Sequence, residues 1–170
     1  MGIATLVPLD EYLRTSYSPD KEYRRGVLVE RSVGNKAHAR LQGRLAGYLV
    51  NREEQWAIEV FTELRIQARA DWYPIPDICV YPAPAPDEEV PSRMPLLWIE
   101  ILSPDDRMVD VWEKAREVIG CGSACVWIID PKTLESELWT EAGSTRILDQ
   151  TLRLPASNIV IPLPEVTGKK

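Results

Sequence analysis

The sequence has few residues of the types that build disulfide frameworks and zinc sites. Its 170 residues include one histidine and three cysteines, Cys79, Cys121 and Cys125. An odd number of cysteines spread in this way excludes a disulfide framework and indicates reduced thiols. The cysteines and the lone histidine form no zinc-ligand pattern. P-loop, GxGxxG and GxSxG motifs are also absent, which excludes the nucleotide-binding and serine-hydrolase sites that depend on them.

Long apolar runs and an excess of positive charge are lacking too. No segment approaches the ~18 apolar residues of a transmembrane helix, and the opening segment has neither the basic start nor the apolar run of a signal peptide. The chain carries 20 Lys and Arg against 26 Asp and Glu, a formal net charge of −6. We therefore expect a cytoplasmic protein without a membrane segment. Any contact with nucleic acid must depend on local basic groups.

The length fits a single domain, which we place at residues 1–165, with a loose tail over 166–170. Hydrophobic periodicity and turn signals predict helices over 7–20, 32–55 and 105–122. They predict strands over 22–30, 56–67, 76–82, 96–103 and 124–131, the first of them entered through a turn at Gly26, followed by a hairpin of 136–141 with 145–150. This mixture predicts an α/β (α+β) fold, with a central mixed β-sheet flanked by helices and an added C-terminal hairpin.

The apolar run "LLWIEIL" contains a carboxylate, Glu100. The run is continuous rather than alternating, which is typical of a strand buried on both faces. An ionised carboxylate there costs several kcal/mol unless it is paired, hydrogen-bonded or bound to a metal. Asp77 stands at the start of a second apolar run, "DICVY". If the two strands pair, the acids repel each other and a divalent cation such as Mg²⁺ removes that penalty. The alternative is an edge residue or a salt-bridge partner.

Several segments resemble, in order, those of one bacterial protein family. They read "KEYRRG", "HARLQGRLAGYL", "TELRI…PIPDICVY", "LLWIEILSPDDR", "DVWEKAREVIGCG" and "VWIIDP". With this order and spacing the chain resembles the Uma-type restriction endonucleases, which belong to the PD-(D/E)XK nuclease superfamily. The resemblance implies a restriction-endonuclease-like fold. It also implies an endonuclease, dependent on Mg²⁺ or Mn²⁺, that hydrolyses phosphodiester bonds of DNA, with a homodimer as the expected assembly.

The resemblance assigns three catalytic positions. Asp77 and Glu100 match the metal-binding acids of the superfamily motif. The lysine expected two positions after the second acid is Leu102 here, and the resemblance places its substitute at Lys114 in the following helix. Lys114 lies about 100° off the apolar stripe of that helix, so its long side chain could reach the strand ends. The alternative is a solvated Lys114 paired with Asp110 at i,i+4.

Four more residues are supporting candidates. Glu22 matches an acid of the family's first segment and could bind the metal or orient a water. His38 lies on the apolar stripe of the 32–55 helix, as a hydrogen-bonded core residue or, as the resemblance implies, as a residue near the acidic cluster that supports it or contacts phosphate. Glu63 matches an acid before the PD strand, with a surface position as the alternative. Arg107 lies two turns before Lys114 on the same flank.

Phosphate contacts are expected from local basic groups, because the chain as a whole is acidic. The candidates are Arg24, Arg25, Lys36, Arg40 and Arg107. Arg25 departs from the family, where many relatives have an acid. Trp72 and Tyr73 are expected to be exposed beside the PD strand, as possible contacts or as the edge of the core.

Two other functions stay open at this point. One is a nuclease-fold module that binds or assembles without cleaving, which the acidic pI, Leu102 and Arg25 favour. The other is a metal-dependent hydrolase of a smaller phosphodiester, for which the negative charge is less of an obstacle.

Overall fold

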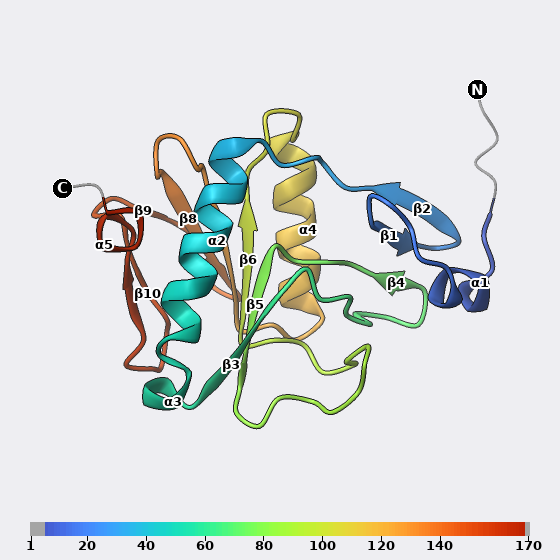
Figure 1. The fold of residues 1–170 in the computed structure, drawn as a ribbon, viewed down its shortest axis with the longest axis horizontal. Helices are drawn as coiled ribbons and strands as arrows, with labels where there is room; N and C mark the ends of the chain where they lie inside the picture. Colours follow the sequence, from blue (N-terminus) through green and yellow to red (C-terminus); the bar gives the residue numbers. More distant parts are fainter. Residues whose placement is uncertain (1–5, 169–170) are drawn as a thin grey trace.

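The centre of the protein is a six-stranded mixed sheet with the strand order β3-β5-β6-β7-β8-β9 (Figure 1). The structure, a computed structural model, describes residues 6–168. β6 and β7 are parallel, and every other neighbouring pair is antiparallel. The predicted central mixed sheet is therefore confirmed. Its strands are β3 (Ile58–Thr62), β5 (Ile78–Pro82), β6 (Leu97–Ile101), β7 (Cys125–Ile129), β8 (Ser136–Thr140) and β9 (Gly143–Ile147).

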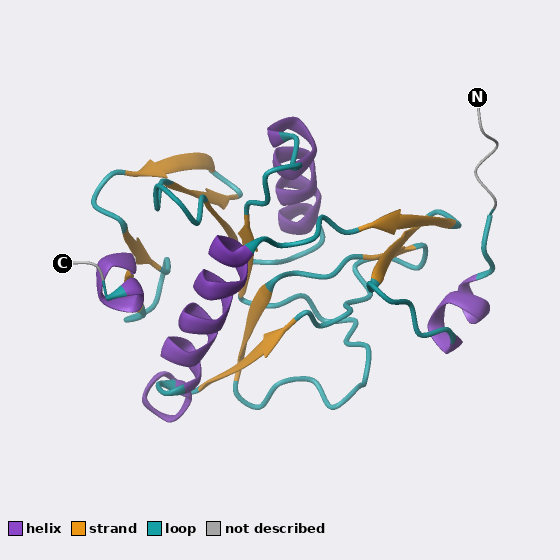
Figure 2. Cartoon of the chain, turned by 45° about the horizontal axis from the view of Figure 1, so that its top comes forward, coloured by secondary structure: helices purple, strands orange, loops and turns teal. Residues whose placement is uncertain are grey.

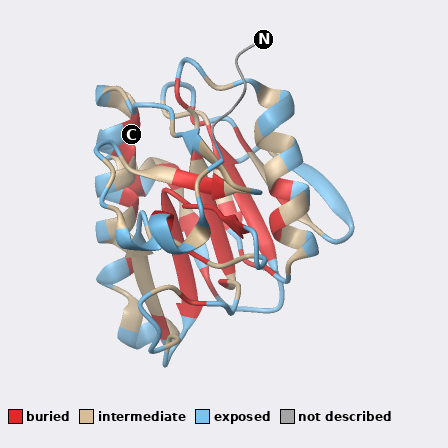
Figure 3. Ribbon diagram, turned by 90° about the vertical axis from the view of Figure 1, so that its right-hand side faces the viewer, coloured by how far each residue is buried: buried red, intermediate tan, exposed pale blue. Residues whose placement is uncertain are grey.

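Two helices, α2 (Lys36–Val50) and α4 (Met108–Gly120), cover opposite faces of this sheet. Successive side chains of a strand point to opposite faces. Ile99 and Ile101 of β6 accordingly pack with Leu45 of α2, whereas Trp98 packs with Val118 of α4. Figure 3 shows the buried strands between the two helices. The continuous apolar run of β6 is thus explained by burial on both faces.

Both long helices are shorter than the segments predicted for them. Asn35 caps α2, because its side chain accepts hydrogen bonds from the backbone N–H groups of Ala37 and His38. After Asn51 the chain forms a separate short helix, α3 (Glu53–Trp56). Helix α4 begins at residue 108 rather than 105, because the preceding residues form a turn in which Asp106 accepts a hydrogen bond from Ser103 N. This turn borders the candidate site.

A small second sheet has the order β2-β1-β4, formed by β2 (Val27–Glu30), β1 (Lys21–Arg24) and β4 (Trp72–Tyr73). The turn predicted at Gly26 is confirmed, but the residues before it form a second strand, β1, rather than only leading into β2. Arg25 and Gly26 have positive φ values of 50° and 83°, and they form the turn of a hairpin. The short helix α1 (Leu9–Arg14) packs Tyr12 against Tyr23 of β1. Figure 2 shows this sheet and α1 beyond one end of the main sheet.

The expected exposure of Trp72 and Tyr73 is wrong. Their relative exposures are 3% and 4%. Tyr73 packs edge-on against the rings of Tyr12 and Tyr23, and Trp72 lies in the α4-side core. Neither side chain is available as a surface contact.

The C-terminal part contains more structure than the sequence predicted. The expected hairpin forms as β8 and β9, and it supplies the last two strands of the central sheet. Beyond it, β10 (Thr151–Arg153) pairs with β11 (Val160–Pro162), and helix α5 (Leu163–Thr167) follows. Val166 of α5 is buried in the α2-side core. The loose tail predicted from residue 166 is thus helical through 167, while 169–170 lie outside the described residues. No helix within 6–168 is long and apolar enough to cross a membrane.

Candidate active site

Asp77 and Glu100 lie opposite each other on neighbouring strands. In the antiparallel pair β5–β6, Ile78 faces Ile99. Continuing this register by one residue places Asp77 across from Glu100. Directly opposite residues of an antiparallel pair have their Cβ atoms about 4.5–5.5 Å apart and point to the same face. Glu100 alternates with Ile99 and Ile101, which face α2, so its side chain points to the α4 side of the sheet. Asp77 directly precedes β5, and its carboxylate lies within hydrogen-bond distance of His38 from α2.

Asp77 is 5% exposed and its carboxylate is held by three protein groups. The backbone N–H of Ile101 donates to Oδ2 at 2.7 Å, and His38 Nε2 lies 3.2 Å from the same oxygen. Arg31 donates to Oδ1 at 3.2 Å. The hydrogen bond to Asp77 raises the pKa of His38 above its usual value, against the lowering effect of burial. Helix α2 therefore contributes a group to the acids of the sheet.

Glu100 and Lys114 form a partly buried ion pair that also includes Glu22. The Lys114 ammonium lies 2.7 Å from Glu100 Oε1 and 2.7 Å from Glu22 Oε1. Burial raises the pKa of Glu100 to about 7, even though the charge of Lys114 lowers it. Burial lowers the pKa of Lys114, but the two carboxylates more than reverse this effect and raise it. The alternative pairing of Lys114 with Asp110 is therefore wrong.

Trp98 also holds the carboxylate of Glu100. Its indole Nε1 donates to Glu100 Oε1 at 2.7 Å, and its ring centroid lies 5.6 Å from Lys114 Nζ. Trp98 and Glu100 are two residues apart in β6, so both side chains point to the α4 face. Within residues 6–168, no protein donor reaches the other oxygen, Oε2.

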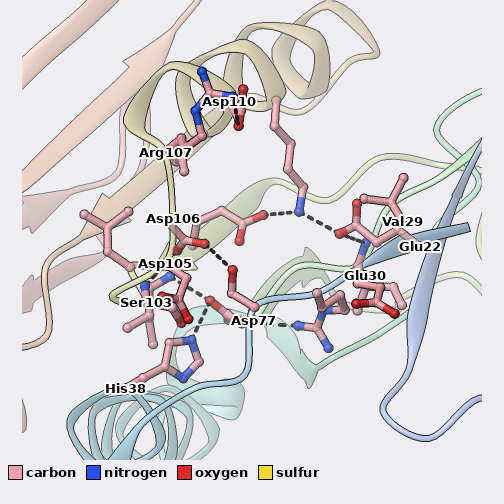
Figure 4. A pocket seen from close by; sticks show the side chains of 18 residues that line it. Glu22, Val29, Glu30, His38, Asp77, Ser103, Asp105, Asp106, Arg107 and Asp110 are labelled. Carbon is pink, nitrogen blue, oxygen red and sulfur yellow. Dashed lines mark hydrogen bonds and ion pairs between the residues drawn. The ribbon is translucent and has the colours of Figure 1, made fainter. Parts of the chain in front are cut away.

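These groups line one cleft with a volume of about 290 Å³. Figure 4 shows Asp77 between the His38 ring and an arginine side chain, with the lysine and Glu22 on the far side of the cleft. Seven residues of the lining are acidic and three are Lys or Arg. The acidic ones are Glu22, Glu30, Asp77, Glu100, Asp105, Asp106 and Asp110.

The supporting candidates have different positions. Glu22 and His38 lie in the cleft and contact Lys114 and Asp77, as described above. Arg107 borders the cleft but is exposed, and it lies 3.8 Å from Asp110. Glu63 is outside the cleft lining, and its Oε1 is 3.8 Å from Arg31. Glu63 therefore reaches the site indirectly: its side chain lies near Arg31, and its backbone N–H donates to the carbonyl of Asp77 at 3.2 Å.

Two contributors were missed by sequence reasoning. Arg31 follows the predicted strand 22–30 and belongs to no quoted motif, so no local signal marked it as the partner of Asp77. Asp106 accepts from Ser32 Oγ at 2.5 Å and from Ser103 N at 2.7 Å, which ties the start of α4 to the segment before α2. The "SPDDR" segment was quoted for the resemblance, but this contact depends on the path of the chain.

The donor set of the cleft fits a hard cation that takes few protein ligands. Across residues 6–168, no group of three or more His, Cys, Asp or Glu has a geometry suited to a metal ion. A cation bound in the cleft would take Asp77 and Glu100 as its protein ligands. Mg²⁺ keeps several waters and accepts one or two carboxylates, whereas structural zinc requires four ligands.

The cysteines play no part in this site. Cys79 and Cys125 are fully buried, and burial raises the pKa of each thiol to about 12. Buried thiols with raised pKa values are unreactive fillers of the core.

The central mixed sheet with helices on both faces is the fold class that the sequence predicts. A family model described as Uma2, "Putative restriction endonuclease", matches residues 9–167, and the chain belongs to this family. A crystal structure of a "putative nuclease belonging to DUF820" from Anabaena variabilis aligns with a TM-score of 0.80 and 22% identity. The alignment covers 95% of this chain and 98% of that chain. At this identity the match shows the fold alone. No curated protein matches the chain.

Proposed function

We propose that the chain is an endonuclease, dependent on a divalent cation, that hydrolyses phosphodiester bonds of DNA. The observation that carries this proposal is the register of β5 and β6, which supports a site where Asp77 and Glu100 share one cation. A bound Mg²⁺ or Mn²⁺ would neutralise the negative charge of the phosphoryl oxygens and lower the pKa of a water bound to it. The protein's own residues do the rest.

Each of these residues has a separate task. Asp77, fixed by Ile101 N and His38, presents a preorganised carboxylate. Glu100 presents its free Oε2, because Oε1 is occupied by Lys114 and Trp98. Lys114 would donate hydrogen bonds to the phosphoryl oxygens as their charge develops, in place of the lysine that is absent at position 102.

The test compares cleavage of supercoiled plasmid in Mg²⁺ or Mn²⁺ by the unaltered protein, Asp77→Asn and Glu100→Gln. Both substitutions keep the shape of the side chain and remove its charge. Each should reduce the rate by more than about 100-fold, because loss of a ligand exceeds the 10–100-fold loss typical for a group that only supports a ligand. Glu54→Gln, an exposed acid on α3, is the control and should cleave normally. Full activity of Asp77→Asn would refute the assignment.

One observation favours a second candidate, a hydrolase of smaller phosphodiesters. The cleft lining has seven acids and three Lys or Arg, which opposes a long polyanion. Cleavage of a model diester without cleavage of plasmid would favour this candidate. Absence of both activities, together with no Mn²⁺ binding in a calorimetric titration, would favour a non-cleaving binding or assembly module.

Cleavage of both strands of a duplex requires two sites, so a homodimer is part of the proposal. Sedimentation equilibrium measures this directly. A monomeric protein that makes only single-strand nicks would refute the homodimer and still support the proposed nuclease activity.

A further inference from the structure

A second, larger groove lies on the other side of α2 from the cleft. Its volume is about 700 Å³, and its walls are α2, the loop between β7 and β8, and the end of α5. The charged residues of its lining are all cations: Lys36, Arg40, Arg44 and Lys132. A chain with six more acidic than basic residues has thus gathered four cations along one groove.

These cations differ from the other basic groups that the sequence suggested for phosphate contact. Arg24 pairs with Glu117, Arg25 with Asp71, and Arg107 with Asp110. Their charges are therefore compensated by neighbouring carboxylates. Lys36, Arg40 and Lys132, by contrast, make no ion pair within residues 6–168. Arg44 donates only to the backbone carbonyl of Thr167. All four groove cations are exposed.

The spacing along α2 suits a strand of phosphates. Lys36, Arg40 and Arg44 follow one another at i, i+4 and i+8, so they lie on one flank of the helix. With a rise of 1.5 Å per residue, the row extends about 12 Å. One strand of a duplex advances about 3.4 Å per phosphate along the helix axis, so the row matches the advance of three to four phosphates.

The groove and the cleft share α2. The inner face of this helix carries His38, which contacts Asp77 in the cleft. Lys36, two residues earlier, lies in the groove. A polyanion held along the outer flank of α2 would therefore begin close to the acidic cleft. This arrangement separates two tasks, since repulsion in the cleft is offset by attraction in the groove.

We propose that the groove of Lys36, Arg40, Arg44 and Lys132 binds the sugar-phosphate backbone of a nucleic acid, flanking the bond that is cleaved. This inference rests on the proposed nuclease function, because it makes the groove a part of the substrate site. The contacts are to phosphates, so they position the strand and carry no sequence preference. The positive charge of the groove would also offset the electrostatic repulsion between an acidic chain and a polyanionic substrate.

The experiment measures binding of a fluorescently labelled DNA duplex to the full chain by anisotropy, in EDTA, over a series of salt concentrations. The test variant is Lys36→Gln/Arg40→Gln/Lys132→Gln. The control is Arg14→Gln/Arg146→Gln/Arg153→Gln, which removes three exposed cations that pair with acids elsewhere. Both triple variants change the net charge equally, and circular dichroism checks their folding.

The slope of log K against log salt changes by about 0.9 per phosphate contact. The groove variant should therefore lose up to about 2.7 from this slope and bind more weakly, while the control should match the unaltered protein. Equal slopes for all three proteins would refute DNA binding by the groove. Cleavage of DNA in Mg²⁺ by the unaltered protein would still support the proposed nuclease function. Binding that depends on the groove in a protein without cleavage activity would support the groove and refute the proposed function.

Two other outcomes would also overturn the inference. In the first, the unaltered protein shows no affinity for DNA in EDTA or in Mg²⁺. In the second, the groove variant changes the sedimentation behaviour of the chain but not its DNA binding. The groove would then hold an acidic surface of a second copy.

Discussion

Lys114 of α4 and Glu100 of β6, 14 positions apart in sequence, meet at 2.7 Å on one face of the central sheet. Glu22, from the small second sheet, reaches the same ammonium at 2.7 Å. One cation thus compensates two carboxylates that would otherwise repel each other. The contact joins three separate parts of the fold at the cleft.

Lys114→Met should lower the free energy of unfolding. Breaking a fully buried ion pair costs about 3–5 kcal/mol. Because the side chains of Lys114 and Glu100 keep 21% and 17% of their exposure, we expect about 2 kcal/mol. Urea unfolding at pH 7 in EDTA measures the loss. The double variant Glu22→Gln/Lys114→Met should lose at least about 0.5 kcal/mol less than the sum of the single variants. Strict additivity would show that the pair is not coupled.

Trp98→Phe should weaken the binding of Mn²⁺ by about 10-fold, because it removes the indole N–H that holds Glu100 Oε1. A calorimetric titration measures the affinity. Trp127→Phe is the matched control, since Trp127 is also fully buried but its Nε1 has no hydrogen-bond partner and it packs on the α2 side. Its Mn²⁺ affinity should not change. Equal losses in the two variants would attribute the effect to core packing instead.

Gly34→Ala should disturb His38. A Cβ at position 34 would lie 2.6 Å from His38 Nδ1, so the ring must shift, and this disturbs its contact with Asp77. We expect a loss of about 10-fold in Mn²⁺ affinity, typical for a group that orients a ligand. At Gly43 of α2, an added Cβ meets nothing within 4 Å. Gly43→Ala should therefore stabilise the protein by about 0.5–1 kcal/mol through helix propensity and leave the affinity intact. Unchanged Mn²⁺ affinity in Gly34→Ala would show that His38 does not orient Asp77 for metal binding.

Alkylation should distinguish the three cysteines. Burial raises the pKa of Cys79 and Cys125 to about 12, so almost no thiolate exists at pH 8, and both side chains are also sterically protected. Cys121, at the end of α4, is partly exposed. Mass spectrometry of the native protein treated with iodoacetamide should find label at Cys121 only, and at all three positions after denaturation. Rapid native labelling of Cys79 would contradict its burial.

Much of the central sheet could be predicted from local patterns. The apolar runs around Glu100 and after Asp77 identified β6 and β5, and the apolar stripes identified α2 and α4. The errors occurred where neighbours far away in the sequence decide the outcome. Tyr73 was expected at the surface but is buried by Tyr12 and Tyr23. The helix α5 is too short to show a period, and it forms because Val166 fits the core beside α2.

The sequence by itself determined that two acids border apolar strands, because the cost of burying a carboxylate depends on local hydrophobicity. Strand alternation then fixed the face to which the Glu100 side chain points. Only the tertiary structure decided which cations compensate these acids. Arg31 and Lys114 reach Asp77 and Glu100 through the paths of distant segments, and contacts of this kind leave no periodic signal along the chain. Of the groove cations, Lys36, Arg40 and Arg44 share a helical spacing that is visible in the sequence, whereas only the fold brings Lys132 to the same groove.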